Sequence, residues 1–95
     1  MYKVILSALG NPEHNEDPFR NIVNGKVIKS KILKRPTVKA CQNAVLQYIE
    51  KNDLGAGNWT GGKVYDANDE YVGRISYNGR FWDKDTEYGN NEIKV

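Results

Sequence analysis

The only histidine of the chain, His14, stands among carboxylates, and imidazole and carboxylate groups are common metal ligands. The neighbouring acids are Glu13, Glu16 and Asp17. A metal site needs its ligands in a fixed geometry, which a single short loop seldom supplies. The acidic positions also differ from the Asp-x-Asp-x-Asp-Gly spacing of calcium-binding loops. We therefore expect a solvated acidic loop that holds no metal and no cofactor.

The only cysteine, Cys41, would need a base beside it to act as a nucleophile, because the thiolate is the reactive form. His14 lies in a separate loop, and the chain has no second histidine. Cys41 also falls on the apolar stripe of a predicted helix, with Ala44, Val45 and Tyr48 at helical spacing. The sequence therefore predicts a buried, unreactive thiol and no catalytic residue. An enzyme that uses Cys41 or the acidic loop is the least supported of three function classes.

Two groups of glycines, Gly55-Ala56-Gly57 and Gly61-Gly62, resemble part of a phosphate-binding loop. Such a loop follows a strand and precedes a helix. Here the predicted order is helix first and strand second. The glycines are better explained as the end of the helix and a tight entry into the next strand.

A run of cations is the strongest candidate for an interaction surface. Residues 26–39 contain no acid, although the net charge of the whole chain is only +2. The six cations of this run are Lys26, Lys29, Lys31, Lys34, Arg35 and Lys39. On a strand Lys29 and Lys31 point to the same face, and Lys34 and Arg35 follow at the strand-to-helix junction. The alternative interpretation, which stays open, is that these charges protect an edge strand from aggregation.

The elements that must position these residues follow from hydrophobic periodicity and turn residues. The pattern predicts one α+β domain over residues 1–95, with the order β-β-α-β-β-β and one amphipathic helix on one face of a mostly antiparallel sheet. The helix is expected to begin after the N-cap Thr37 and to end near Lys51. Residues 9–25 read as a long loop and 84–95 as a loose tail, in which 92–95 could add a short edge strand. The strands are expected at residues 2–8, 26–34, 63–66, 71–77 and 80–83.

The last two strands are joined by Asn78-Gly79, a strong signal for a type I′ hairpin turn. With a two-residue turn, Tyr77 lies opposite Arg80 and Ile75 lies opposite Trp82. We expect Ile75 and Trp82 to face the core, while the opposite choice of core face stays open. Tyr77 and Arg80 at the tip are a candidate contact point, because Tyr and Arg are enriched at interface hot spots.

The composition excludes some classes of protein. A single cysteine allows no intramolecular disulfide and favours a reducing cytoplasm. No apolar run approaches the roughly 20 residues that span a bilayer, and the N-terminal residues do not form a secretory signal. We therefore expect a cytoplasmic protein with no membrane partner.

Three segments, residues 37–44, 61–66 and 75–83, resemble small proteins of phages and mobile elements, among them anti-CRISPR proteins that block type I surveillance complexes. The shared features are a strand-strand-helix-hairpin order and a late Asn/Asp-Gly-Lys/Arg-x-Trp element, here Asn78 to Trp82. The resemblance covers about residues 26–83. It implies a partner in a bacterial host: a defence protein complex or its nucleic-acid channel, occupied by Lys29, Lys31, Lys34 and Arg35.

We therefore predict a non-catalytic binding protein that inhibits or modulates a host protein complex. The expected partner-binding residues are Lys29, Lys31, Lys34, Arg35, Tyr77 and Arg80. The alternative is a small nucleic-acid-binding protein that uses the basic face of residues 26–39 and the aromatic side chains of the hairpin.

Overall fold

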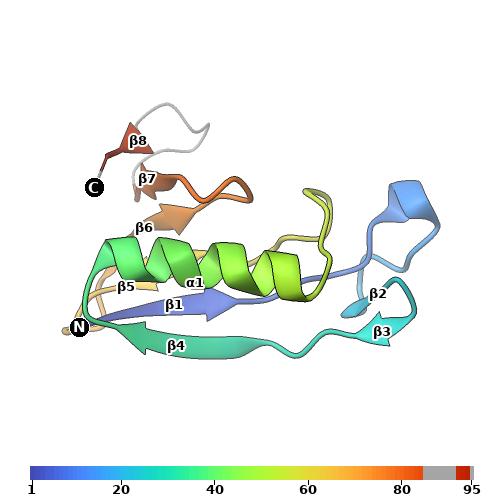
Figure 1. Ribbon diagram of the computed structural model, residues 1–95, viewed down its shortest axis with the longest axis horizontal. Helices are drawn as coiled ribbons and strands as arrows, with labels where there is room; N and C mark the ends of the chain where they lie inside the picture. Colours follow the sequence, from blue (N-terminus) through green and yellow to red (C-terminus); the bar gives the residue numbers. More distant parts are fainter. Residues whose placement is uncertain (85–91, 95) are drawn as a thin grey trace.

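A six-stranded antiparallel sheet with one helix across one of its faces makes up most of the molecule (Figure 1). The computed structural model describes residues 1–84 and 92–94. The strand order is β4-β1-β5-β6-β7-β8, and a separate two-stranded hairpin, β2-β3, extends from one end. The elements are β1 (Tyr2–Leu6), the 3-10 helix η1 (Pro12–His14), β2 (Ile22–Val23), β3 (Lys26–Val27), β4 (Lys31–Arg35), α1 (Val38–Lys51), β5 (Lys63–Tyr65), β6 (Tyr71–Ile75), β7 (Phe81–Asp83) and β8 (Glu92–Ile93).

The predicted α+β class and the single helix are confirmed. Strands β4 and β5 both pair antiparallel with β1, one on each side, so α1 carries the chain across β1 from the β4 edge towards the middle of the sheet. This is a β-α-β crossover with a third strand inserted between its two strands. Thr37 caps the helix as expected, because its side-chain oxygen accepts a hydrogen bond from the Ala40 amide at 3.1 Å.

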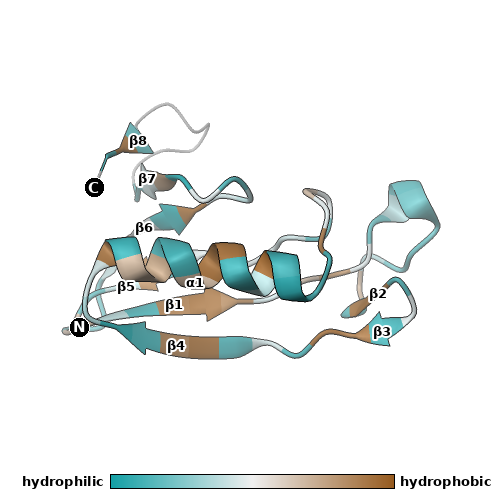
Figure 2. Ribbon diagram, viewed as in Figure 1, coloured by the Kyte–Doolittle hydropathy of each residue, from teal (hydrophilic) through white to brown (hydrophobic). Residues whose placement is uncertain are grey.

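The core lies between α1 and the sheet face that it covers. The apolar stripe of α1 packs over the inward side chains of β1, Val4 and Leu6, and over Val64 of β5. Figure 2 shows the outward side of the helix as mostly hydrophilic. Each fully buried aliphatic side chain of this kind stabilises the fold by about 1.5–3 kcal/mol. The buried residues of α1 are Cys41, Ala44, Val45, Tyr48 and Ile49.

Alternation along β4 sends its side chains to two different faces. Leu33 lies opposite the buried Val4, so it faces the helix, and Lys31 and Arg35 lie on the same side of the strand. Ile32 lies opposite Ile5 and points to the uncovered face. β4 is an edge strand, because within the described residues its second edge is paired with no strand.

The strand predicted over residues 26–34 is two strands with a break at Ile28–Ser30. Ile28 is buried at the break, where its amide donates to the Asn21 carbonyl oxygen at 2.7 Å and its own carbonyl oxygen accepts from the Asn21 side chain. Lys29 lies in this break, so the prediction that it shares a strand face with Lys31 was wrong. The two adjacent apolar residues Val27 and Ile28 mark the place where strict alternation stops.

The segment predicted as the long loop 9–25 contains η1 and β2, and it is held by the carboxylate of Glu16. That carboxylate accepts hydrogen bonds from the amides of Asn11 and Asn24 at 2.9 and 2.7 Å, and from the side chain of Asn58 at 3.2 Å. Asn11 and Asn58 are both buried. At the tip of the β2-β3 hairpin Asn24 and Gly25 have φ of 52° and 76°, so both turn residues take the left-handed conformation that a type I′ turn demands.

The β6-β7 hairpin has a different turn from the one predicted. Only Gly79 has a positive φ, 82°, and its amide donates to the Ser76 carbonyl oxygen, while the Ser76 amide donates to the Arg80 carbonyl oxygen. This is a three-residue loop with one left-handed residue, not a type I′ turn. The extra residue shifts the pairing by one position, so Ile75 lies opposite Phe81 and both are buried.

Trp82 is therefore on the other face of the sheet, opposite Arg74, and the prediction that it belongs to the core was wrong. Its indole N–H donates to the Ser76 hydroxyl at 3.0 Å. In the predicted tail, Glu92 and Ile93 form the edge strand β8 beside β7, as the sequence allowed. The remainder of that prediction, residues 85–91 and 95, lies outside the described residues.

Within residues 1–84 and 92–94, no helix has both the length and the apolar character needed to cross a membrane.

The hydrogen bonds to Glu16 predict a loss of stability in acid. The amides of Asn11 and then Asn24 hold the pKa of the Glu16 carboxyl below its usual 4.5. The unfolded chain therefore takes up this proton first as the pH falls, so the contribution of Glu16 to stability is present above pH 4.5 and is lost below it. Glu16→Gln should lower the melting temperature at pH 7 and flatten its dependence on pH below 4.5. An unchanged acid profile would contradict this role.

A second prediction concerns Gly79, which combines its positive φ with close contact to the helix. A Cβ on Gly79 would lie 3.0 Å from the Leu46 side chain, whereas one on Gly25, also at positive φ, would meet nothing. Gly79→Val should lower the free energy of unfolding by about 1–3 kcal/mol from backbone strain, with a further loss from the clash. The matched control, Gly25→Val, should show the strain alone, and denaturant unfolding measures both. Equal losses would mean that the Leu46 contact contributes nothing.

Candidate functional site

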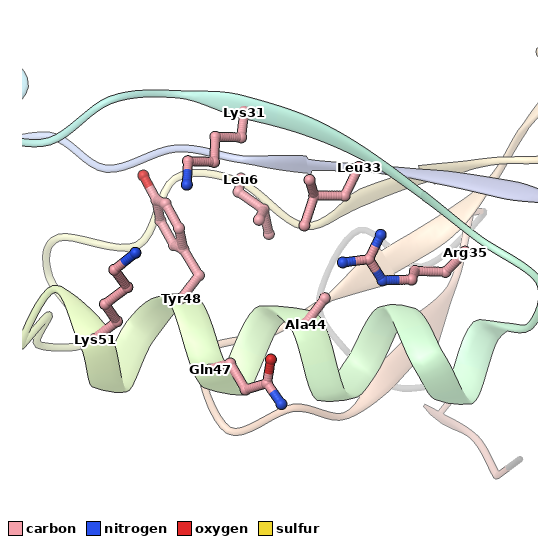
Figure 3. Close-up of a pocket in the computed structure, with 8 residues that line it drawn as sticks. All are labelled: Leu6, Lys31, Leu33, Arg35, Ala44, Gln47, Tyr48 and Lys51. Carbon is pink, nitrogen blue, oxygen red and sulfur yellow. The ribbon is translucent and has the colours of Figure 1, made fainter.

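A groove with cations on both sides runs between β4 and α1. It has a volume of about 250 Å3 and a floor that includes the buried Leu6 and Ala44. Lys31 and Arg35 reach into it from β4, and Lys51 reaches in from the last turn of α1 (Figure 3). Leu33, Gln47 and Tyr48 complete its lining.

A second hollow of about 200 Å3 continues the groove towards the break before β4. It shares Lys31, Tyr48 and Lys51 with the first hollow and adds Lys29. The Tyr48 hydroxyl donates to the Lys29 carbonyl oxygen at 2.9 Å, and this bond fixes the break against the helix. Burial raises the pKa of the Tyr48 phenol, so the hydroxyl keeps the proton that it donates. We refer to the two hollows together as the basic groove.

The basic groove has a strongly positive electrostatic character. Its four cations, Lys29, Lys31, Arg35 and Lys51, form no ion pair with any other described residue, and no carboxylate lines either hollow. The Arg35 guanidinium donates one hydrogen bond to the Lys34 carbonyl oxygen at 2.7 Å and keeps its other N–H groups available. Like charges gathered on a low-dielectric floor favour an anionic ligand.

The structure brings together three of the predicted binding residues and separates the others. Lys29, Lys31 and Arg35 line the basic groove, whereas Lys34 lies opposite Lys3 on the other face of the sheet. Sequence reasoning missed Lys51, although it follows Tyr48 by one turn of the same helix. The spacing of Ala44, Tyr48 and Lys51 places all three on the side of α1 that faces β4.

Tyr77 is part of the fold rather than a free contact at the hairpin tip. It is half-buried, packs against the core, and donates its hydroxyl to the Leu54 carbonyl oxygen at 3.1 Å. A second bond fixes the tip to α1 itself, because the Gln42 side chain donates to the Gly79 carbonyl oxygen at 3.0 Å. Arg80 is exposed beside this anchored loop, far in sequence from the groove residues. The two predicted tip residues therefore have different surroundings, Tyr77 packed into the fold and Arg80 exposed.

The glycines that resembled a phosphate loop bring backbone segments close together. The Gly62 amide donates to the Ile5 carbonyl oxygen at 2.7 Å, and its carbonyl oxygen accepts from the Ile75 amide at 2.8 Å. Gly62 has a φ of 103°, which a side chain would strain. These contacts confirm the prediction of a tight entry into the next strand.

His14 is exposed at the end of η1. Among residues 1–84 and 92–94, no three His, Cys, Asp or Glu side chains are grouped as ligands of one metal ion would be.

Comparison with known proteins gives no match: no protein-family model, no curated protein and no solved structure is significantly similar to the chain. The resemblance to anti-CRISPR proteins therefore stays a hypothesis.

Cys41 is predicted to be inert in the native protein. It is 0% exposed, and burial raises the pKa of its thiol, an effect that the positive charge of Arg35 offsets only in part. The thiol is therefore protonated at neutral pH and out of reach. A thiol reagent should label native Cys41 no faster than the chain unfolds, and Cys41→Ala should leave partner binding intact. Rapid labelling of the folded protein would contradict its burial.

Proposed function

We propose that the chain is a binding protein without catalytic activity of its own, which recognises an acidic segment of a partner protein in the basic groove. The observation that carries the proposal is the gathering of four cations along the two adjoining hollows of the basic groove, where none of them forms an ion pair with another described residue: Lys29, Lys31, Arg35 and Lys51. Each charge-assisted hydrogen bond to a carboxylate in such a place stabilises a complex by about 1.5–3 kcal/mol.

The edge of the sheet favours an extended segment as the ligand. β4 has an unpaired edge among the described residues and also forms one wall of the basic groove. A partner strand that pairs with β4 would gain main-chain hydrogen bonds, and alternate side chains of that strand would point towards Lys31 and Arg35. Carboxylates at those alternate positions complement the groove.

The edge-protection alternative makes a different prediction from the binding proposal. Protective cations prevent copies of the chain from pairing at the strand edge. Their removal would therefore cause self-association, with no effect on the binding of a partner protein. Protection requires charges along the strand edge, whereas Lys51 comes from the helix and points into the same hollow (Figure 3). The contribution of α1 to the groove therefore favours binding.

The resemblance to anti-CRISPR proteins extends the proposal to a bacterial defence complex as the partner. A channel that binds nucleic acid is itself basic and would repel the basic groove. The groove therefore suits an acidic surface of such a complex better than the interior of its nucleic-acid channel.

Charge reversal in the groove tests the proposal. The tagged chain is used to capture proteins from a nuclease-treated bacterial lysate, as wild type, as Lys31→Glu/Arg35→Glu, and as the control Lys39→Glu. Lys39 is exposed on α1 and lines neither hollow. We expect a specific protein to be retained by wild type and control, and its affinity to fall at least about tenfold in the double variant. Equal capture of the partner by all three proteins would refute the proposal that the basic groove binds it. Self-association of the double variant with unchanged capture would also refute this proposal.

The identity of the partner needs a separate measurement. The chain is added to a purified type I surveillance complex, and binding of the complex to its DNA target is measured. Inhibition that Lys31→Glu/Arg35→Glu abolishes supports a role in blocking bacterial defence. Unchanged DNA binding would exclude the type I surveillance complex as the partner. Whether the basic groove binds another protein would then be decided by the capture experiment.

A further inference from the structure

The face of the sheet turned away from α1 carries two cross-strand rows of cations and aromatic rings, the second of which ends in the acid Glu92. One row runs Lys34–Lys3–Tyr65–Tyr71 across β4, β1, β5 and β6. The other runs Lys63–Arg74–Trp82–Glu92 across β5, β6, β7 and β8. The helix lies on the opposite face (Figure 1), and the packed core contains none of these eight side chains. We refer to the two rows as the open face.

The cations of the open face lie opposite one another in two pairs, and among the described residues one of the four, Lys3, has an acid as its partner. Lys3 lies directly opposite Lys34, and Lys63 lies directly opposite Arg74. Like charges at directly opposed positions of a sheet destabilise it. Lys3 forms an ion pair with Asp69, but Lys34, Lys63 and Arg74 have no carboxylate partner among the described residues. The Lys63–Arg74 pair therefore lowers the stability of the free chain, and the Lys3–Lys34 pair does so less because Asp69 offsets the charge of Lys3. A bound polyanion would remove this cost.

The aromatic rings of the open face form a platform between the cations. The rings of Tyr65 and Tyr71 are in contact, with centroids 5.7 Å apart, and the Lys63 ammonium lies over the Tyr71 ring, 6.0 Å from its centroid. Trp82 follows two strands away from Tyr65. All three rings are half-buried, so each is held in place while part of its surface is accessible.

An apolar hollow continues the platform towards the β4 edge. It has a volume of about 240 Å3 and is lined by Ile5, Ile32 and Tyr65, with Lys3 and Asp69 also lining it. Ile32 is 66% exposed, which is high for a large aliphatic side chain on a strand. The open face thus has an apolar hollow and aromatic rings in one area, beside cations of which Lys34, Lys63 and Arg74 form no ion pair with another described residue.

We propose that the open face binds single-stranded nucleic acid. Unpaired bases stack on aromatic side chains, and the phosphates between them are neutralised by Lys and Arg. Tyr65, Tyr71 and Trp82 supply the stacking surfaces, while Lys34, Lys63 and Arg74 supply the charges. In a duplex the bases stack on one another and cannot stack on the aromatic rings of the protein. A single strand is therefore the ligand that complements both the rings and the cations.

The open face is separate from the basic groove. Lys34 is on the opposite side of β4 from Lys31 and Arg35, because successive residues of a strand point to opposite faces. Variants of one surface therefore leave the other intact, and the two proposals can fail independently. The open face extends the function to a second ligand and does not depend on the proposed protein partner.

Stacking is tested with a fluorescein-labelled dT oligomer, its fluorescence anisotropy being measured at low and physiological salt. Tyr65→Leu removes the ring and should weaken binding at least about fivefold, whereas Tyr65→Phe keeps the ring and should bind as wild type does. Phe19→Leu is the control, because Phe19 is 90% exposed and outside the open face. Melting temperatures verify that each variant is folded. Loss of affinity in Tyr65→Leu alone supports the proposal, and equal affinity of Tyr65→Leu and wild type overturns it.

The cations are tested by Lys34→Gln/Lys63→Gln in the same assay. Each lost phosphate contact should reduce the slope of log affinity against log salt by about 0.7, the value for single strands. The same substitutions relieve like-charge repulsion, so the melting temperature should stay constant or rise while affinity falls. Lys31→Glu/Arg35→Glu, in the basic groove, should bind the oligomer almost as wild type does. Equal binding of a duplex, of the oligomer and of poly-glutamate would show a general attraction for anions and refute the proposal.

Discussion

The packing of α1 over β1 and β4 is the interaction on which the other features of the molecule depend. One helix can cover only one face of a six-stranded sheet. Because successive side chains of a strand point to opposite faces, those on the covered face are buried and those on the other face stay accessible. On β1 this places Val4 and Leu6 under the helix. On β4, at the edge, the same alternation places Lys31 beside the helix and Lys34 on the opposite face. One packing event therefore creates both the basic groove and the open face.

The features that the sequence predicted well are those fixed by a single period or a single cap. The stripe of α1 and its cap at Thr37 needed no tertiary information, and the burial of Cys41 followed from its place on that stripe. The antiparallel sheet followed from several short alternating segments separated by turn residues. The periodic signals of the helix and strands repeat over many residues, so an error at one position does not change the fold.

The features that the sequence did not predict depend on one residue or on contacts between distant segments. Asn-Gly fits both a two-residue turn and a three-residue loop, and the chain uses the first at Asn24-Gly25 and the second at Gly79. A change of one residue in a loop moves Trp82 from one face to the other. Likewise, the bond from Tyr48 to the Lys29 carbonyl interrupts a basic segment that local pattern reads as one strand.

Although the net charge is only +2, the acidic and basic side chains have different surroundings in the structure. Several carboxylates accept hydrogen bonds from backbone amides in turns: Glu16 from Asn11 and Asn24, Asp17 from Phe19, and Asp66 from Asn68 and Glu70. Their charge is largely satisfied by the chain itself. The cations of β1, β4, β5 and β6 instead lie on strand faces, and Lys3, beside Asp69, is the one among them that forms an ion pair with another described residue. Positive potential is therefore available to a ligand on both faces of β4, although the total charge is nearly balanced. This division, with acids stabilising turns and bases left on accessible surfaces, is the physical basis on which both proposed ligands are anionic.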